Sequence, residues 1–200
     1  MKDDIKLVIL KNLLAEVSQK YDDLLGEKEE ELKKHFEKAI KDSLTGIYNR
    51  FYFFESIESK IPRYKRENKK LIVAFVDLDN FKQVNDTLGH DVGDEVLKDV
   101  VKIIKESIRE YDMVARYGGD EFILYFDTEN IEIVEKILKR IVEKIDSKLN
   151  KYKISASYGL AVYPDDGESV EKLLKIADER MYAQKIDKKS KKILHIKENK

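Results

Sequence analysis

The stretch that decides the fold is Arg116-Tyr117-Gly118-Gly119-Asp120-Glu121-Phe122, which places two glycines and two carboxylates between apolar segments. The flanking segments, residues 113–115 and 122–126, predict β-strands. A Gly-Gly pair between two strands predicts a hairpin turn, because glycine tolerates the positive φ angles that tight turns require.

The composition of this turn also suggests a binding site. Gly118 and Gly119 lack β-carbons, so a backbone N–H can approach a phosphate group closely. Asp120 and Glu121 supply the oxygen atoms that bind a divalent cation. An ordinary charged hairpin tip has the same residues, and the turn alone does not separate the two interpretations.

A second acidic cluster lies earlier in the chain. Residues 71–76 form an apolar run that predicts a buried strand, and the run ends at Asp77 and Asp79. Carboxylates there are costly to desolvate unless a cation meets them, and Mg²⁺ suits oxygen ligands and phosphates. Asp77 is the favoured ligand, together with Asp120. Asp79 can share the same strand face, so the spacing does not decide between the two residues. Capping of the next helix by this pair is the alternative to metal binding.

The segment after this strand carries further polar groups. Lys82 is placed to contact a phosphate as a point charge. Asn85 and Asp94 supply an amide and a carboxylate, which match the hydrogen-bonding edge of guanine. Taken singly, these two residues are more typical of turns and helix caps than of ligands, and a lone His90 is more typical of a surface loop.

The chain resembles the GGDEF-domain diguanylate cyclases. Residues 118–122 resemble the family signature, and three further blocks match in order and at family-like spacing: residues 42–50, 77–94 and 177–185. The resemblance covers about residues 42 to 190. We therefore expect a GGDEF diguanylate cyclase domain at 42–200 and an N-terminal helical extension at 1–41.

The resemblance implies an enzyme that condenses two GTP molecules into cyclic di-GMP and releases two pyrophosphates. It implies that Mg²⁺, or Mn²⁺ in its place, is bound by Asp77, the backbone carbonyl of Leu78, Asp120 and Glu121. The implied catalytic residues are Asp120, which draws the proton from the attacking 3′-hydroxyl, Glu121 and Lys82. The implied substrate-binding residues are Phe81, Asn85, His90, Asp94, Gly118, Gly119, Lys185 and Lys189.

The chain differs from the family pattern at one phosphate-binding position and matches it at one further site. The family's late helix commonly continues into a Gly-Arg-Asn segment whose arginine helps to bind phosphates, and here Lys189 stands in for it without bidentate geometry. Arg109 and Asp112 form an R-x-x-D pattern, with five residues between Asp112 and Gly118. In the family, this pattern is the allosteric site at which cyclic di-GMP inhibits the enzyme.

Each GGDEF domain resembles half an active site, because each 3′-hydroxyl must attack the other nucleotide's α-phosphate. We therefore expect a homodimer. Residues 4–41 are helix-like, with a heptad-like apolar run at Leu10, Leu14, Val17, Tyr21 and Leu24. Gly26 is expected to end one helix before a second begins near residue 27. Packing of this stalk on its own domain is the alternative to dimerisation.

Composition narrows the class of protein. Charged residues make up 40% of the chain while the net charge is −1, which argues against a nucleic-acid-binding surface. No apolar run is long enough for a membrane span, and the lack of cysteine agrees with the cytoplasm, where GTP resides. Two alternatives remain open: a catalytically silent receptor for GTP or cyclic di-GMP, and a cyclase that makes a different cyclic nucleotide.

The predicted elements indicate an α/β (α+β) fold with a palm-like, ferredoxin-like mixed sheet of about five strands flanked by helices, preceded by a helical stalk. Gly159 is expected to let another backbone segment approach its strand closely. The expected helices are 49–66, 92–108, 130–149 and 169–186, and the expected strands are 71–77, 113–117, 121–126, 153–162 and 192–196.

Overall fold

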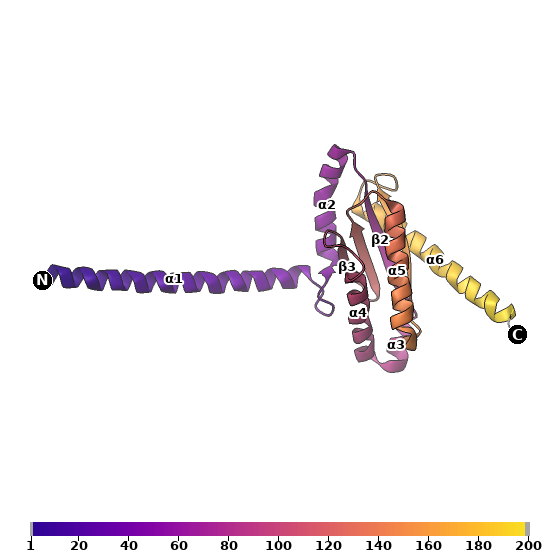
Figure 1. The fold of residues 1–200 in the computed structure, drawn as a ribbon, viewed down its shortest axis with the longest axis horizontal. Helices are drawn as coiled ribbons and strands as arrows, with labels where there is room; N and C mark the ends of the chain where they lie inside the picture. The colour runs from indigo at the N-terminus through magenta and orange to yellow at the C-terminus, as the bar shows by residue number, and fades with distance from the viewer. Residues whose placement is uncertain (1, 199–200) are drawn as a thin grey trace. The chain divides into compact units, whose positions relative to one another are not determined.

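The computed structural model describes residues 2–198, with side chains described at 6–7 and 9–191. The chain divides into two compact units, Met1–Ile40 and Lys41–Lys200. The first unit is the helix α1 (Lys2–Ile40). The second unit contains β1 (Tyr48–Asn49), α2 (Arg50–Glu67), β2 (Leu71–Asp79), α3 (Phe81–Leu88), α4 (His90–Lys105), β3 (Met113–Gly118), β4 (Glu121–Phe126), α5 (Ile131–Lys148), a 3-10 turn (Asn150–Tyr152), β5 (Ser155–Tyr163) and α6 (Val170–Glu198) (Figure 1).

The strands form one mixed sheet in the order β1-β3-β4-β2-β5. β1 runs parallel to β3, and the other three neighbouring pairs are antiparallel. This sheet, flanked by helices and preceded by a long helix, confirms the predicted fold class. Local sequence signals support the helices: Asn49 caps α2 by accepting from Tyr52 N at 2.9 Å, and Asn130 caps α5 by accepting from Ile133 N at 3.1 Å.

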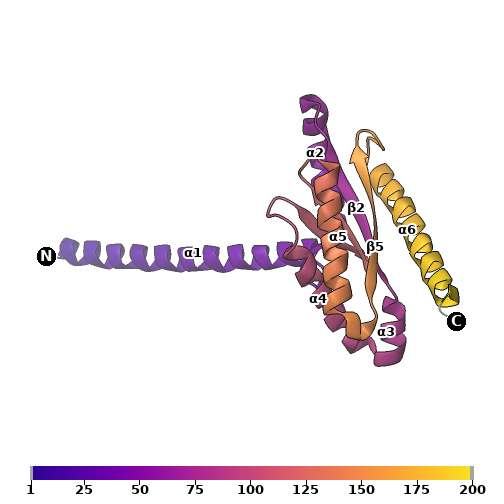
Figure 2. The same cartoon turned by 45° about the vertical axis from the view of Figure 1, so that its right-hand side comes forward.

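The central strand β2 is buried on both faces, and alternate side chains enter two different apolar clusters. Its even-numbered residues, from Ile72 to Leu78, pack with α4 and α5. Its odd-numbered residues, from Leu71 to Phe75, pack with α2 and α6. Figure 2 shows α5 and α6 on opposite sides of β5. The polar residues that continue the odd-numbered series, Asp77 and Asp79, therefore lie on the α6 face of the sheet.

Gly159 determines how closely α6 approaches β5. A Cβ atom at Gly159 would lie 2.1 Å from the Ala177 carbonyl oxygen and 2.3 Å from Met181 N. The expected close backbone approach at this glycine is confirmed. Gln184 Oε1 then accepts a 2.8 Å hydrogen bond from Tyr158 N. These contacts set which α6 side chains reach the end of β2.

Three local predictions were wrong. Residues 192–196 continue α6 and are not a strand. The two-residue strand β1, which was not predicted, completes the five-stranded sheet. Lysine-rich sequence suits a continuing helix, and isolated apolar residues do not make a strand without a partner. α1 passes through Gly26 without a break, because a single interior glycine costs only about 1 kcal/mol relative to alanine. The polar segment after β2 forms an additional helix, α3.

Among the described residues, no helix combines the length and the apolar character needed to cross a lipid bilayer.

Candidate functional site

The hairpin and the end of β2 meet side by side. Leu78 N donates a 3.2 Å hydrogen bond to the Asp120 carbonyl oxygen, and Asp77 is the cross-strand partner of Glu121. The two acidic segments, more than forty residues apart in the sequence, are thus joined by backbone pairing. The predicted convergence of Asp77 and Asp120 follows from the register of the sheet.

An arginine braces the turn. Arg116 donates to the Gly119 carbonyl oxygen through Nε at 3.0 Å and Nη2 at 2.7 Å. Its Nη1 also forms an ion pair with Asp42 at 3.1 Å. Hydrogen bonds from Thr45 and the Arg116 charge outweigh the effect of burial and hold the pKa of Asp42 below its ordinary value. The loop before β1 therefore helps to fix the position of the acidic turn.

The Asp77 carboxylate is paired with a lysine of α6. Lys185 Nζ donates to Asp77 Oδ1, and the same nitrogen lies 3.8 Å from Asp79 Oδ1. The side chains of Lys185 and Asp77 are only 22% and 15% exposed, so this ion pair is shielded from solvent. The one cation closest to Asp77 is thus a long, flexible side chain.

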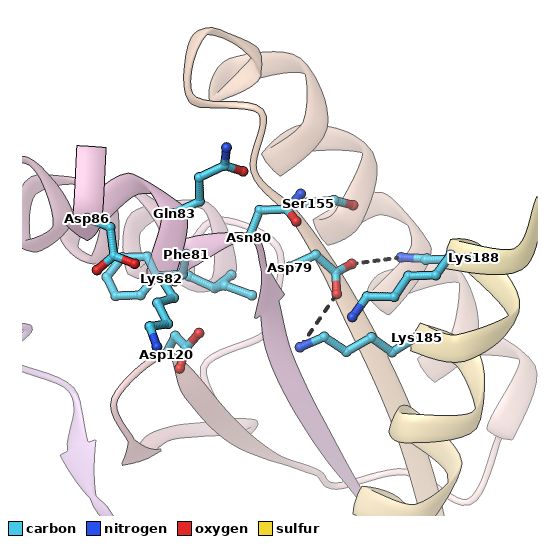
Figure 3. Close-up of a pocket in the computed structure, with 12 residues that line it drawn as sticks. Asp79, Asn80, Phe81, Lys82, Gln83, Asp86, Asp120, Ser155, Lys185 and Lys188 are labelled. Carbon is cyan, nitrogen blue, oxygen red and sulfur yellow. Dashed lines mark ion pairs between the residues drawn. The ribbon is translucent and has the colours of Figure 1, made fainter. Parts of the chain in front are cut away.

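Asp79 has its own set of partners. Ser157 Oγ donates to Asp79 Oδ2 at 2.9 Å. Lys188 Nζ lies 3.7 Å from the same oxygen (Figure 3). The helix cap of α3 is Asn80, which adopts a left-handed conformation with φ of 69°. A capping role for Asp79 is therefore excluded, and its carboxylate is held by β5 and α6.

Negative charge accumulates at this end of the sheet. Burial raises the pKa of Asp77 in spite of Lys185, and the charges of Asp120 and Asp79 raise it further. Burial also raises the pKa of Glu121, with additional contributions from Asp77, Asp120 and Asp178. Burial lowers the pKa of Lys185, but the hydrogen bond and charge of Asp77 outweigh it and leave the pKa raised. The acidic side chains therefore favour an additional cation.

The donor set fits a magnesium ion that shares its coordination with phosphate. Mg²⁺ usually keeps several water ligands and uses one or two protein carboxylates plus substrate oxygens. Within the part of the chain that the structure describes, no three His, Cys, Asp or Glu side chains converge closely enough to hold an ion by themselves. Asp77 and Asp120 suit the shared kind of site.

An open cavity of about 630 Å³ adjoins these carboxylates. Figure 3 shows Lys82 of α3 and Lys185 of α6 extending toward it from different sides. Six of the residues expected at the site line the cavity: Leu78, Phe81, Lys82, Asp120, Lys185 and Lys189. Four lysines and three aspartates line this open cavity, and together they form a surface suited to a phosphate chain with its metal.

The residues expected to read guanine lie apart from that cavity, on α3 and α4. Asn85 is half-buried on α3, and its Oδ1 atom is buried without a hydrogen-bond partner among the described residues. Asp94 is half-buried on α4, and His90 is exposed at the start of α4. Gly93 makes room for Asn85, because a Cβ there would lie 1.9 Å from Asn85 Oδ1.

Arg109 and Asp112 lie in the turn between α4 and β3, beside a second cavity of about 370 Å³. Asp112 Oδ2 accepts from Arg109 N at 2.9 Å, and Asp112 Oδ1 accepts from Asp127 N at 3.3 Å. The Arg109 side chain is exposed. The two residues of the pattern therefore have different environments.

Four contributors to the site were not predicted from the sequence. Arg116 and Asp42 lie inside the motifs considered, but nothing local indicates that they pair. Gly93 carries a detectable signal, since an interior helix glycine often marks a close contact. Lys188 donates to the Ala156 carbonyl oxygen at 2.5 Å and lies near Asp79, although nothing in the sequence distinguishes it from the neighbouring lysines.

Residues 39–191 match the family described as "Diguanylate cyclase, GGDEF domain". Cyclic di-GMP phosphodiesterase NbdA of Pseudomonas aeruginosa is 39% identical over 143 residues, 70% of this chain and 18% of NbdA. Response regulator PleD of Caulobacter vibrioides is 30% identical over 156 residues, 74% of this chain and 34% of PleD. The chain thus spans well under half the length of these curated relatives.

Solved structures agree with the sequence matches. The coiled coil and GGDEF domain of DgcB from Caulobacter crescentus, in complex with c-di-GMP, superposes with a TM-score of 0.77 at 27% identity, covering 89% of this chain and 95% of that one. The GGDEF domain of TpbB (YfiN) from Pseudomonas aeruginosa superposes with a TM-score of 0.68 at 33% identity, covering 74% of this chain and 89% of that one.

Proposed function

Because the chain belongs to the GGDEF diguanylate cyclase family, we propose that it condenses two GTP molecules into cyclic di-GMP and two pyrophosphates, with Mg²⁺ as cofactor. The observation that carries the proposal is the pairing of the β2 end with the Gly118–Glu121 turn, which brings Asp77, Asp120 and Glu121 together. Mn²⁺ has the same preference for oxygen ligands and is a second suitable ion.

The residues of this site have two proposed roles, metal binding and proton transfer. Asp77, the Leu78 carbonyl, Asp120 and Glu121 would hold the metal ion together with phosphate oxygens, and the ion would acidify the attacking hydroxyl and neutralise the charge of the pyrophosphate. Asp120 accepts the proton of the 3′-hydroxyl, and Glu121 supports its charge. Positioning and electrostatic stabilisation account for most of the rate enhancement expected in such a transfer.

The triphosphate occupies the 630 Å³ cavity in this proposal. Lys82, Lys185 and Lys189 bind its oxygens, beside Phe81 and the turn glycines Gly118 and Gly119. Lysine acts here as a point charge, without the bidentate fit of arginine.

Guanine lies between α3 and α4, where Asn85 and Asp94 meet its hydrogen-bonding edge and His90 lies near the nucleotide. The buried, unpaired Asn85 Oδ1 supports this placement. An unsatisfied buried acceptor costs about 1–3 kcal/mol, and the N–H groups of guanine relieve that cost.

Two copies of the chain are needed to bring two GTP molecules together. We assign residues 1–41 to a dimerising stalk and 42–200 to the cyclase domain. Leu10, Leu14 and Val17 on α1 are 62–72% exposed, a large apolar surface for an isolated helix. A homodimer through α1 covers it, and size-exclusion chromatography with light scattering tests this assignment.

Product inhibition is assigned to Arg109 and Asp112, with cyclic di-GMP bound beside the α4–β3 turn. The exposed Arg109 fork suits guanine edges and phosphates. We place the enzyme in the cytoplasm, where its substrate is found.

Incubation with GTP and Mg²⁺, followed by mass analysis of the products, tests the proposal. Cyclic di-GMP from GTP alone is the expected result. Bound nucleotide without turnover would indicate a silent receptor, and mixed products in the presence of ATP would indicate a cyclase of broader specificity.

A further inference from the structure

Lys185 is already engaged by Asp77, although the proposed function needs both side chains for other partners. Its ammonium contacts Asp77 and lies 3.8 Å from Asp79 Oδ1. It also lines the cavity assigned to the triphosphate. A single lysine is thus within reach of the metal ligand and of the phosphate site.

We propose that Lys185 is an exchangeable counter-ion that neutralises Asp77 in the nucleotide-free protein and moves to the phosphates when GTP binds. This inference rests on the proposed function. The transfer frees Asp77 for the metal ion at the moment when the phosphate oxygens that complete its coordination arrive. Metal and nucleotide therefore bind cooperatively, and each binds weakly alone.

The charges around Asp77 explain why a counter-ion is needed. The pairing of β2 with β4 places Asp77 beside Glu121, and Asp120 directly precedes Glu121 in the turn. Asp178 of α6 adds to the negative potential felt by Glu121. Half-buried like charges repel strongly, because water screens them poorly. An ammonium on Asp77 lowers that repulsion before a metal ion is present.

The neighbouring lysine explains why Lys185 is free to move. Asp79 receives two hydrogen-bond contacts from Ser157 Oγ, at 2.9 and 3.1 Å, and lies 3.7 Å from Lys188 Nζ. Lys188 is itself tethered to the Ala156 carbonyl oxygen at 2.5 Å. Asp79 therefore keeps its partners when Lys185 leaves. A lysine stem has four carbons and many rotamers, so its ammonium can change partners without movement of α6.

The first experiment measures Mn²⁺ binding to the nucleotide-free protein by titration calorimetry. Lys185→Met should strengthen Mn²⁺ binding by about 5- to 150-fold, the usual range of coupling between two sites. Lys188→Met controls for the general loss of a positive charge near the site. Lys191→Met controls for the loss of a Lys–Asp pair on the same helix. Lys191 Nζ lies 2.6 Å from Asp187 Oδ2, and neither residue lines the cavity. Equal strengthening by Lys188→Met would overturn the proposal.

The second experiment measures binding of a GTP analogue with a methylene bridge between the α- and β-phosphates, in EDTA. Lys185→Met should weaken binding, the opposite of its effect on Mn²⁺. Asp77→Asn should strengthen binding, because Lys185 is released to the phosphates. In the Lys185→Met background, Asp77→Asn should have much less effect. An equal gain in both backgrounds would mean general repulsion and would overturn the proposal.

The two claims fail in different ways. If the unaltered protein binds neither Mn²⁺ nor the analogue, the proposed function fails. If it binds both, but Lys185→Met weakens both or leaves Mn²⁺ binding unchanged, the proposed function stands and the counter-ion role of Lys185 is wrong.

Discussion

Asp77 and Asp112 are both half-buried aspartates near the ends of strands, but they have different kinds of partner. Asp77 is paired with the ammonium of Lys185, a side chain that can turn toward another anion. Asp112 accepts hydrogen bonds from two backbone amides, Arg109 N and Asp127 N, which cannot leave without unfolding the turn. The Asp77 carboxylate can change its partner, whereas the Asp112 carboxylate is needed to hold the turn together.

The turn that contains Asp112 is also anchored to α2. Tyr64 of α2 donates a hydrogen bond to the Asp127 side chain and shares a 2.7 Å hydrogen bond with Tyr125. Burial and the bond to Asp127 raise the pKa of Tyr64 to about 12, so its hydroxyl remains protonated at physiological pH. Because backbone amides already occupy the Asp112 carboxylate, recognition of a ligand at the proposed feedback site depends chiefly on Arg109, whose side chain is exposed.

The largest effect is expected at the end of the sheet that contains Asp77 and Asp120. Asp120→Ala should reduce cyclic di-GMP formation by about 10²–10⁴-fold, the usual contribution of a positioned base, and the loss of a metal ligand adds to this. Its melting temperature should not fall, because the change removes one of several crowded negative charges. Turnover is followed by mass analysis and melting by circular dichroism. Full activity in this variant would refute the assigned role.

A smaller effect is expected where α3 meets α4. Gly93→Ala places a methyl group 1.9 Å from Asn85 Oδ1, so the amide must move. Overpacking of this kind costs about 1–3 kcal/mol, and GTP affinity should fall by roughly ten-fold. Gly26→Ala in α1 is the matched control, since a Cβ there meets nothing within 4 Å. Unchanged affinity for GTP in Gly93→Ala would separate Asn85 from guanine recognition.

Because the Asp112 carboxylate is part of the turn and the Arg109 side chain is exposed, substitutions of these two residues should have distinct effects. Arg109→Ala should weaken inhibition by cyclic di-GMP roughly ten-fold, because hydrogen bonds from a charged group contribute about 1.5–3 kcal/mol. Stability should not change, since the turn uses only the Arg109 backbone. Asp112→Ala should lower the free energy of unfolding by about 1–2 kcal/mol through the loss of both amide partners. Activity against product concentration and urea denaturation separate the two, and undiminished inhibition in Arg109→Ala would remove the feedback assignment.

The smallest effect concerns a third carboxylate with fixed partners. Arg180 binds Asp166 through both Nη atoms at 2.7 Å and holds the pKa of Asp166 below its ordinary value. A lowered carboxyl pKa contributes stability above the ordinary pKa, and that contribution is lost as the pH falls through the lowered value.

Asp166→Asn should therefore lower the free energy of unfolding at neutral pH by up to about 1 kcal/mol, because the pair is partly exposed. The unfolding curves of the variant and the unaltered protein should converge in acid. Asp187→Asn, which removes an exposed pair with Lys191, is the control. A difference that persists unchanged at low pH would assign the effect to packing.

Much of the fold follows from patterns within short segments. The apolar run of β2, the Gly-Gly turn before β4 and the helix α5 were all predicted, because backbone preference and amphipathic period are local properties. The failures came where a segment has weak local preference. β1 has only two residues and exists because β3 is available to pair with it. The C-terminal part of α6 continues as helix, and none of the described strands pairs with it.

The sequence by itself determined the chemistry of the site: carboxylates at a strand end and in a glycine turn, and lysines at helical positions beyond them. The tertiary structure decided which carboxylate each lysine meets. Asp77 and Asp79 are equivalent by spacing, and they differ because Ser157 and Lys188 bind Asp79 whereas Lys185 binds Asp77. That choice depends on the register of β5 and on the approach of α6 over Gly159, contacts between residues far apart in the chain.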